Sequence, residues 1–237
     1  MFRILIDVLK LESLKSKNMQ NINQYIEHTI LKANATHKDI DKIVQEAREY
    51  QFKGICVPPF WVKKARKGLG ESDVQLVTVS GFPFGYNKTE TKVFEIEEAM
   101  RDGADEVDIV WNLSAYNSEM NWVKQDIARC ANVLHDHGKY LKVILETAYL
   151  TKEGIEAGCQ ICKDAGADFV KTSTGFAHEG AMVDKVKIMR AALPSSVGIK
   201  AAGGIKDLET TVAMIKAGAD RIGTSSGVAI IQEARDM

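Results

Sequence analysis

The sequence lacks an excess of charge of either sign. Its 31 lysine and arginine residues stand against 32 aspartate and glutamate residues, which gives a formal net charge of -1. The longest basic cluster is short and comprises Lys63, Lys64, Arg66 and Lys67. Proteins that bind nucleic acids neutralise phosphates with a concentrated basic surface, which this composition does not provide. The sequence therefore argues against polyanion binding as the main function. No nucleic acid partner is predicted.

The sequence also lacks a long hydrophobic run and a dense set of cysteines. The apolar stretch from Ile4 to Leu11 is interrupted by Asp7 and Lys10, and no small-residue cleavage site follows it. It therefore fits neither a signal peptide nor a membrane span, and no membrane partner is predicted. Four cysteines are too few for a disulfide framework and favour a reducing compartment, so we expect a cytoplasmic location.

Two of the cysteines, Cys159 and Cys162, form a lone CxxC pair inside a helical pattern. A structural zinc site needs about four ligands, and no second pair is present in the sequence. The pair is therefore predicted to pack inside the protein rather than to hold a metal or undergo redox chemistry.

No linker divides the chain. Its 237 residues include 4 prolines, and no stretch rich in Pro, Gly or Ser separates two halves. We therefore expect one domain over residues 21–237, preceded by an N-terminal extension over residues 1–20.

What the sequence does contain is an internal repeat. The tripeptide Gly-Ala-Asp begins at Gly103, Gly166 and Gly218, each time after an amphipathic segment and before a β-branched one. Glycine commonly ends a helix, so each repeat predicts a helix followed by a strand. The repeats are spaced at about twice the roughly 30 residues of one strand-and-crossover unit, so an unmarked strand is expected inside each interval.

Eight strands alternating with eight helices are predicted in this way. The expected strands are 25–30, 52–57, 74–80, 140–146, 197–200 and the segments that follow the three repeats. The expected helices are 36–50, 59–68, 88–102, 119–137, 151–165, 181–193, 206–217 and 226–235. This alternation indicates an α/β fold of the closed (β/α)8 barrel type, also called a TIM barrel. A doubly wound open sheet is the alternative, but no glycine-rich phosphate loop follows the first strand.

Charged residues are predicted inside the barrel. Along a parallel strand, alternate residues face the helices and must be apolar, so the residues between them face the lumen. This parity places three acids and three lysines in the lumen: Glu106, Asp108, Lys142, Glu146, Lys171 and Lys200. A paired structural network remains an equally good interpretation for Glu106 and Lys142, which lie low on their strands.

Lys171 and Lys200 are the strongest candidates for chemistry. Both lie at the C-terminal ends of predicted strands, where barrel enzymes place their catalytic groups. Two ammonium groups in one desolvated site repel each other, so at least one lysine is expected to have a lowered pKa. A free amine at the mouth of a barrel is a nucleophile that can form a Schiff base.

Three loops of small residues follow the last strands. Lys171 precedes Thr-Ser-Thr-Gly, Lys200 precedes Ala-Ala-Gly-Gly, and Ile222 precedes Gly-Thr-Ser-Ser-Gly. Small residues before a helix leave backbone N–H groups free to hold a phosphate. Three such loops on neighbouring strands favour a phosphorylated substrate.

These segments resemble the deoxyribose-phosphate aldolase family. The similarity extends through seven ordered motifs, namely IEHTILK (26–32), GFPFG (81–85), DEVDIVWN (105–112), LKVILET (141–147), FVKTSTGF (169–176), KAAGGI (200–205) and IGTSSG (222–227). The resemblance implies a (β/α)8 barrel and a class I aldolase. Such an enzyme reversibly cleaves 2-deoxy-D-ribose 5-phosphate to acetaldehyde and glyceraldehyde 3-phosphate, in deoxyribonucleotide breakdown, and uses no metal or other cofactor.

The resemblance also implies roles for individual residues. Lys171 would form the Schiff base, Lys200 would perturb its pKa and share in proton transfer, and Asp108 would shuttle protons. Glu27, where the family usually has Asp, would contact the substrate hydroxyls. Further substrate-binding or phosphate-binding positions are Cys56, Thr174, Gly203, Gly204, Gly223, Ser225 and Ser226. Lys206 stands where an arginine is frequent, which should soften phosphate binding because lysine lacks a planar fork.

Other residues receive simpler interpretations. His28 lacks a carboxylate partner at fixed spacing and is expected to be structural, and Phe82 and Phe84 are expected to wall the pocket. The competing functions are a Schiff-base aldolase or transaldolase acting on a different sugar phosphate, and a sugar-phosphate binding protein without catalysis. A zinc-dependent aldolase is disfavoured because no histidine cluster approaches a ligand set. A homo-oligomer, dimer or tetramer, is expected.

Overall fold

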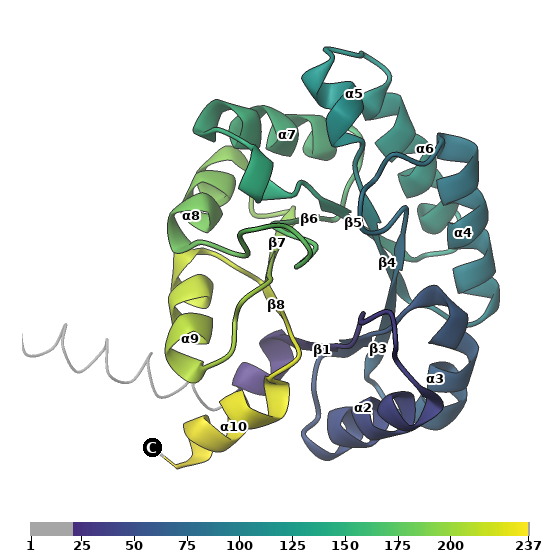
Figure 1. The fold of residues 1–237 in the computed structure, drawn as a ribbon, viewed down its shortest axis with the longest axis vertical. Helices are drawn as coiled ribbons and strands as arrows, with labels where there is room; N and C mark the ends of the chain where they lie inside the picture. The colour runs from purple at the N-terminus through teal and green to yellow at the C-terminus, as the bar shows by residue number, and fades with distance from the viewer. Residues whose placement is uncertain (1–20, 237) are drawn as a thin grey trace, which may run out of the picture.

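Eight parallel strands close into a ring in the computed structural model, which describes residues 21–236 (Figure 1). The strands are hydrogen-bonded in sequence order, and the first pairs with the last: Ile26 lies opposite Ile222 and Glu27 opposite Gly223. The predicted (β/α)8 barrel is confirmed. The extension expected over residues 1–20 lies outside the described residues.

The strands are short. They are β1 (Ile26–Thr29), β2 (Gly54–Cys56), β3 (Gln75–Ser80), β4 (Glu106–Val110), β5 (Tyr140–Ile144), β6 (Phe169–Lys171), β7 (Gly198–Ala202) and β8 (Arg221–Thr224). Each lies within or close to a segment predicted as a strand.

Helices cover the outside of the ring (Figure 1). They are α2 (His37–Glu49), α3 (Val62–Leu69), α4 (Thr89–Arg101), α5 (Leu113–Asn117), α6 (Val123–His135), α7 (Lys152–Asp164), α8 (Val183–Ala192), α9 (Leu208–Ala217) and α10 (Gly227–Arg235). Short 3-10 turns lie at Ile22–Tyr25, Pro59–Trp61 and Thr147–Tyr149. In residues 21–236, none of these helices is long and apolar enough to cross a membrane.

Helix α2 shows why these segments are helical. Its buried residues, Ile40, Ile43, Val44 and Ala47, recur at the three- and four-residue spacing that places them on one face. A capping box formed by Thr36 and Asp39 satisfies backbone N–H groups at its start. The other long helices present a similar buried stripe to the barrel.

The Gly-Ala-Asp repeats tie neighbouring strands together. The glycines have φ values of 103°, 86° and 112° and end α4, α7 and α9 in the left-handed conformation. The aspartates that follow, Asp105, Asp168 and Asp220, each accept a hydrogen bond of 2.8 Å from the backbone N–H of a residue in the preceding strand. These residues are Leu76, Leu141 and Ile199, so the repeats join β3 to β4, β5 to β6 and β7 to β8. One repeat for every two strands explains their spacing.

The strands alternate as predicted from parity. Val107, Ile109, Leu141, Val143 and Ile199 are buried in the apolar layer between the barrel and the helices. The residues between them point into the lumen. The barrel therefore has an apolar outer layer and a charged interior, and that interior carries the candidate site.

Candidate active site

A cluster of buried charges fills the interior of the barrel. Its members come from five strands: Glu27 on β1, Glu106 and Asp108 on β4, Lys142 on β5, Lys171 on β6, and Lys200 on β7. None has more than 3 % of its surface exposed. Strand register brings them together, because Asp108 lies opposite Lys142 and Lys171 lies opposite Lys200.

Asp108 lies at the centre of the cluster. Its Oδ2 atom accepts hydrogen bonds from Nζ of Lys171 at 2.9 Å and from Nζ of Lys200 at 2.8 Å. Its Oδ1 atom lies 3.1 Å from Nζ of Lys142. One carboxylate thus holds the three lysine amines in fixed positions, with Lys171 and Lys200 on the same oxygen.

The remaining acids complete the pairing. Glu27 accepts a hydrogen bond from Lys200 and lies 3.5 Å from Nζ of Lys142, which also donates to Glu106. Arg221, at the start of β8, lies 3.7 Å from Glu27. Glu106 and Lys142 therefore form the paired network that was one of the two interpretations for them.

One predicted member of the cluster is elsewhere, and one was missed. Glu146 follows the end of β5 in a left-handed conformation with φ of 54°, and its carboxylate accepts from Thr174 rather than from a lysine. The prediction that Glu146 joins the lysines was wrong. Glu27 takes that place, and strand parity had a signal for it, since Glu27 lies between two outward-facing residues, Ile26 and His28.

The pKa values follow from this pairing. Burial opposes the charged form of Asp108, but the three neighbouring lysines outweigh it and hold the Asp108 pKa well below its usual value. Glu27 shows the same balance, and Lys142 and Lys200 lower its pKa. Burial works against charged Lys200, yet Asp108 and Glu27 raise the pKa of Lys200 above its ordinary value. The expected effect of repulsion between two ammonium groups is therefore not found at Lys200, because carboxylates lie between them.

A cavity of about 400 Å³ opens above the cluster, at the ends of β1, β6, β7 and β8. Lys171 lines it, whereas Lys200 and Asp108 lie beneath. The complete lining is Thr29, Ile30, Leu31, Lys32, Lys171, Thr174, Gly175, Phe176, Ala202, Gly203, Gly204, Gly223, Thr224 and Ser225. The structure thus presents one amine of the cluster, that of Lys171, to a ligand.

Most residues predicted to bind phosphate lie in this cavity. Gly203, Gly204, Gly223 and Ser225 line it, and Gly203 and Gly204 both have positive φ. A Cβ atom at Gly203 would lie 3.0 Å from the Cα of Gly180, so the loop after β6 leaves no room for a side chain there. Ser226 is not part of the lining; its backbone N–H donates to Thr224 Oγ1.

Thr174 is held in the cavity wall by Glu146. Its backbone N–H and its hydroxyl both donate to the Glu146 carboxylate, and its hydroxyl oxygen accepts from the N–H of Phe176. Phe176 packs edge-on against Phe82. Glu146, buried but absent from the lysine cluster, therefore orders the loop that follows Lys171.

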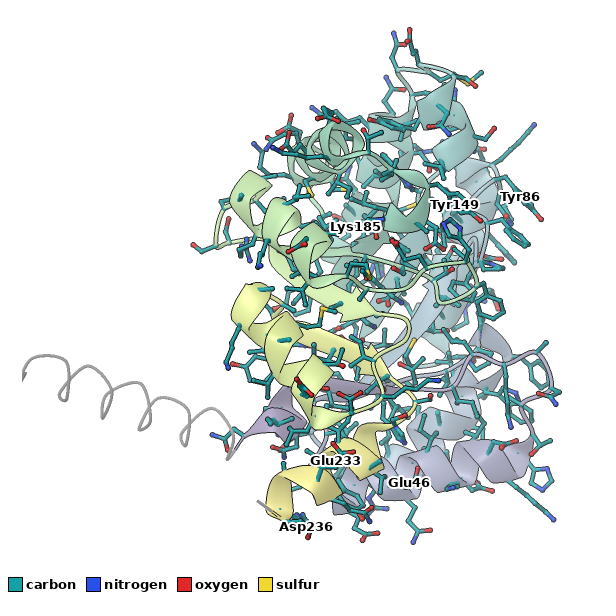
Figure 2. The ribbon with its side chains drawn as sticks, turned by 60° about the vertical axis from the view of Figure 1, so that its left-hand side comes forward. Glu46, Tyr86, Tyr149, Lys185, Glu233 and Asp236 are labelled. Carbon is teal, nitrogen blue, oxygen red and sulfur yellow. The ribbon has the colours of Figure 1, made fainter. Side chains whose placement is uncertain are left out.

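Neither aromatic residue predicted to wall the pocket, Phe82 or Phe84, lines the cavity that Lys171 reaches. Phe84 lines a smaller neighbouring cavity of about 70 Å³ together with Glu146 and Tyr149, whereas Phe82 packs on the apolar group around Cys56. Figure 2 labels Tyr86, which stacks on Phe84, and Tyr149.

Cys56 does not line the cavity as expected. It is fully buried at the end of β2 and packs with Val77 and Val79. Burial raises the pKa of its thiol to about 11. Cys56 is therefore not among the residues that face this cavity.

His28, Cys159 and Cys162, interpreted as structural, lie outside the lumen, although His28 has a carboxylate partner that its position in the sequence did not indicate. His28 points away from the lumen, and its Nε2 atom lies 2.9 Å from Glu46 Oε2 on α2, labelled in Figure 2. Cys159 and Cys162 are free thiols buried in the layer between α7 and the barrel. Among residues 21–236, no group of three or more His, Cys, Asp or Glu side chains is placed to hold a metal ion.

Comparison with known proteins gives a consistent set of similarities. The family model described as DeoC/LacD family aldolase matches residues 19–233. The chain is 49% identical over 219 residues to a deoxyribose-phosphate aldolase of Thermococcus gammatolerans, with 91% of this chain and 97% of that protein covered. It is 50% identical over 216 residues to the enzyme of the same name from Brevibacillus brevis, again with 91% and 97% covered.

A solved structure shares the fold closely. The tetrameric deoxyribose phosphate aldolase from Aeropyrum pernix superposes with a TM-score of 0.84 at 32% sequence identity, and 92% of each chain is covered. The barrel described above and its relatives therefore agree over nearly the whole of the described chain.

Proposed function

Because the chain belongs to the DeoC/LacD family of aldolases, we propose that Lys171 forms a Schiff base with the aldehyde carbon of 2-deoxy-D-ribose 5-phosphate. The reaction is the cleavage of that sugar phosphate to acetaldehyde and D-glyceraldehyde 3-phosphate, which makes the protein a lyase. A single observation carries the assignment of Lys171: of the three lysines bound to Asp108, Lys171 is the one that reaches the cavity.

The covalent sequence follows from the substrate and product. The neutral Lys171 amine adds to C1 of the open-chain sugar, and loss of water leaves an iminium. As the C3 hydroxyl gives up its proton, the C2–C3 bond breaks and its electron pair forms the C1–C2 enamine. This step releases glyceraldehyde 3-phosphate. Protonation at C2 and addition of water then release acetaldehyde and restore the amine.

Asp108 and Lys200 are the charged groups next to the Lys171 amine. Asp108 binds Lys171 and Lys200 through the same oxygen, so a proton can pass between the amines without a large movement of side chains. Its lowered pKa keeps Asp108 in the carboxylate form, which can accept hydrogen bonds from both amines. Lys200, kept charged by Asp108 and Glu27, places positive charge beside the developing carbinolamine oxygen.

The loops around the cavity fit the two ends of the substrate. Gly203, Gly204, Gly223 and Ser225 would receive the phosphate through backbone N–H groups and the serine hydroxyl. Thr174, fixed by Glu146, would contact the sugar near Lys171. Glu27 accepts a hydrogen bond from Lys200 below the cavity. We therefore assign Glu27 to charge pairing with Lys200 rather than to a contact with the substrate hydroxyls.

Broader expectations also remain proposals. We propose a homo-oligomer, supported by the tetrameric relative from Aeropyrum pernix. The four free, buried cysteines favour the predicted cytoplasmic location. The absence of a nucleic acid partner stays a prediction from the balanced charge.

Trapping with borohydride tests the assignment. Incubation of the protein with 2-deoxy-D-ribose 5-phosphate and borohydride should give a reduced adduct that peptide mapping finds on Lys171. Lys171→Arg keeps a cation beside Asp108 but cannot form an iminium, so it should give no adduct and no acetaldehyde. An adduct on Lys142 or Lys200 in the parent protein would overturn the assignment. No turnover of this sugar phosphate, together with an adduct on Lys171 and cleavage of another one, would indicate an aldolase for a different sugar phosphate.

Metal removal provides a second test. The proposed steps use amines and carboxylates alone, so activity should survive exhaustive treatment with EDTA. Acetaldehyde release before and after chelation measures this. Loss of activity that zinc restores would place the protein in the metal-dependent class of aldolases.

A further inference from the structure

The cavity contains one charged side chain that the proposed mechanism does not use. Of its fourteen lining residues, two carry a charge, Lys171 and Lys32. Lys171 is bound to Asp108 and is assigned to the Schiff base. Lys32 lies in the segment between β1 and α2, and about half of its side chain is exposed.

Closure of the barrel places Lys32 beside the small-residue loops. Strand β1 pairs with β8, so the segment that leaves β1 runs next to the loop after β8. Thr29, Ile30, Leu31 and Lys32 accordingly form one wall of the cavity, and Gly203, Gly204, Gly223 and Ser225 contribute to the rest. Lys32 and those loops line the same cavity, so a phosphate held by the loops would share the cavity with the Lys32 ammonium.

Lys32 is free to change partners. In this structure its Nζ atom donates to Asp39 Oδ1 at 2.9 Å in an exposed ion pair, and such pairs contribute little to stability. Asp39 does not depend on that contact, because its other oxygen accepts from the backbone N–H of Thr36 at 2.8 Å and from the Thr36 hydroxyl at 2.7 Å. The cap of α2 therefore persists when Lys32 leaves.

A phosphate group needs such a cation. Neutral backbone N–H groups and a serine hydroxyl donate hydrogen bonds to its oxygens but carry no net charge, and a lysine ammonium adds the opposite charge that these donors lack. Lys206, the basic residue next to the glycine pair in the sequence, is exposed and is not part of the described cavity lining.

We propose that Lys32 is the cationic ligand of the substrate phosphate and determines the preference for phosphorylated over unphosphorylated sugar. This inference rests on the proposed function. On substrate binding, the Lys32 ammonium moves from Asp39 to the phosphate held by the loops after β7 and β8.

Paired substrates and matched variants test this inference. Lys32→Met keeps the length of the stem and removes the charge, and Lys32→Arg keeps the charge. Lys206→Met tests the competing cation, the basic residue that follows the glycine pair in the sequence. Each variant is assayed with 2-deoxy-D-ribose 5-phosphate and with 2-deoxy-D-ribose. Lys32→Met should lower kcat/KM for the phosphorylated sugar by about 10-fold or more, mainly through KM, since a charge-assisted hydrogen bond is lost.

The same variant should leave kcat/KM for 2-deoxy-D-ribose within about twofold of the parent value, because that sugar makes no ionic contact with Lys32. Lys32→Arg should recover most of the loss. Raising the ionic strength should weaken binding of the phosphorylated sugar to the parent protein more than to Lys32→Met.

Binding of inorganic phosphate, followed by titration calorimetry, needs no chemistry at Lys171. Weaker binding to Lys32→Met than to the parent and to Lys206→Met would support the inference. Equal losses for both sugars in Lys32→Met would assign Lys32 to loop structure and overturn it. A selective loss in Lys206→Met alone would move the cation to Lys206 and also overturn it. Failure of the parent protein to form an adduct on Lys171 would instead refute the proposed function, whatever the phosphate data show.

Discussion

Asp108 shows how much of the site depends on single atoms. One of its oxygens binds the amines of both Lys171 and Lys200, and the other lies near Lys142. A carboxylate so placed is at once the counter-charge for three buried lysines and the nearest acceptor for a proton from the reactive amine. Stability and catalysis are therefore coupled at this residue.

Asp108→Asn separates these two roles. Turnover should fall by about 100-fold or more, the usual range for loss of a general acid or base. Slow adduct formation at Lys171 should remain in borohydride trapping, because an amide still orients the amine. The variant should also lose about 3–5 kcal/mol of unfolding free energy in urea, since buried lysines lose their partner. Full turnover in this variant would contradict the proposed proton transfer.

Ser225 and Ser226 are adjacent in sequence but differ in position. Ser225 lines the cavity and Ser226 does not. Ser225→Asp should therefore raise KM for 2-deoxy-D-ribose 5-phosphate strongly, by like-charge repulsion, and should affect 2-deoxy-D-ribose little. Ser226→Asp is the matched control and should show a smaller effect. Steady-state kinetics with both sugars measures this, and equal effects of the two variants would place the phosphate elsewhere.

Parity along the strands predicted five of the six clustered charges, and its one error has a local cause. The alternation was continued along β5 to Glu146, but the strand ends at Ile144 and the chain turns into a left-handed conformation. Sequence patterns do not show where a regular strand stops. The pKa of Lys200 could not be predicted either, because it depends on which carboxylates lie between the lysines, and this requires the register of five strands.

At the level of elements, the three Gly-Ala-Asp repeats have a common structural role. Each aspartate accepts a hydrogen bond from a backbone N–H of the preceding strand. Each also contacts a basic side chain: Arg66 for Asp105, His135 for Asp168 and Arg190 for Asp220. The repeat was read from the sequence as a helix end followed by a strand. Its second role, as a clamp between paired strands, involves residues 21 to 29 positions apart and was not predicted.

The clamps should differ in strength with exposure. The Asp105 side chain is 24% exposed and that of Asp220 is 50% exposed. Asp105→Ala leaves the Leu76 N–H without its partner and should cost about 1.5–3 kcal/mol, the range for hydrogen bonds to charged groups. Asp220→Ala should cost less, because water can replace the carboxylate. Urea unfolding of both variants compares them, and a larger loss for Asp220→Ala would contradict this account.

Helix boundaries were predicted within a few residues, with one exception. The sequence pattern predicted a helix over 119–137, whereas α6 begins at Val123 and a separate short helix, α5, precedes it. Helix α5 has only 5 residues, which is too short a segment to show a helical hydrophobic period in the sequence. The side chain of Asn112 caps the start of α5, because its oxygen accepts a hydrogen bond from the N–H of Ala115.

For the whole molecule, the buried cluster makes stability depend on pH at both extremes. Asp108 and Glu27 have lowered pKa values in the folded state, so their contribution is present above their ordinary values of 3.8 and 4.5 and is lost as the pH falls. Lys142 and Lys200 have raised pKa values, so their contribution is present below 10.5 and is lost at higher pH. The four buried thiols also have pKa values raised above the ordinary 9.0, so stability should be nearly constant only between roughly pH 5 and 8.

Urea midpoints measured from pH 2 to pH 11 test this expectation, with Asp108→Asn as the control. The difference in stability between parent and variant should be largest near neutral pH and should shrink below pH 3.8, where Asp108 begins to protonate in the unfolded chain. A difference that grows as the pH falls would show that Asp108 does not stabilise the fold as a carboxylate.

The pairing of β1 with β8 also determines when the reactive centre can exist during synthesis. Glu27 and Lys200 are 173 residues apart in the chain, and their contact requires a ring whose last strand begins at Arg221. Domains fold as their segments emerge from the ribosome, starting from the N-terminus. A nascent chain that ends before β8 can hold Lys171 and Asp108 but has no closed lumen around them. The fully paired amine cluster therefore arises only after nearly the entire chain has been translated.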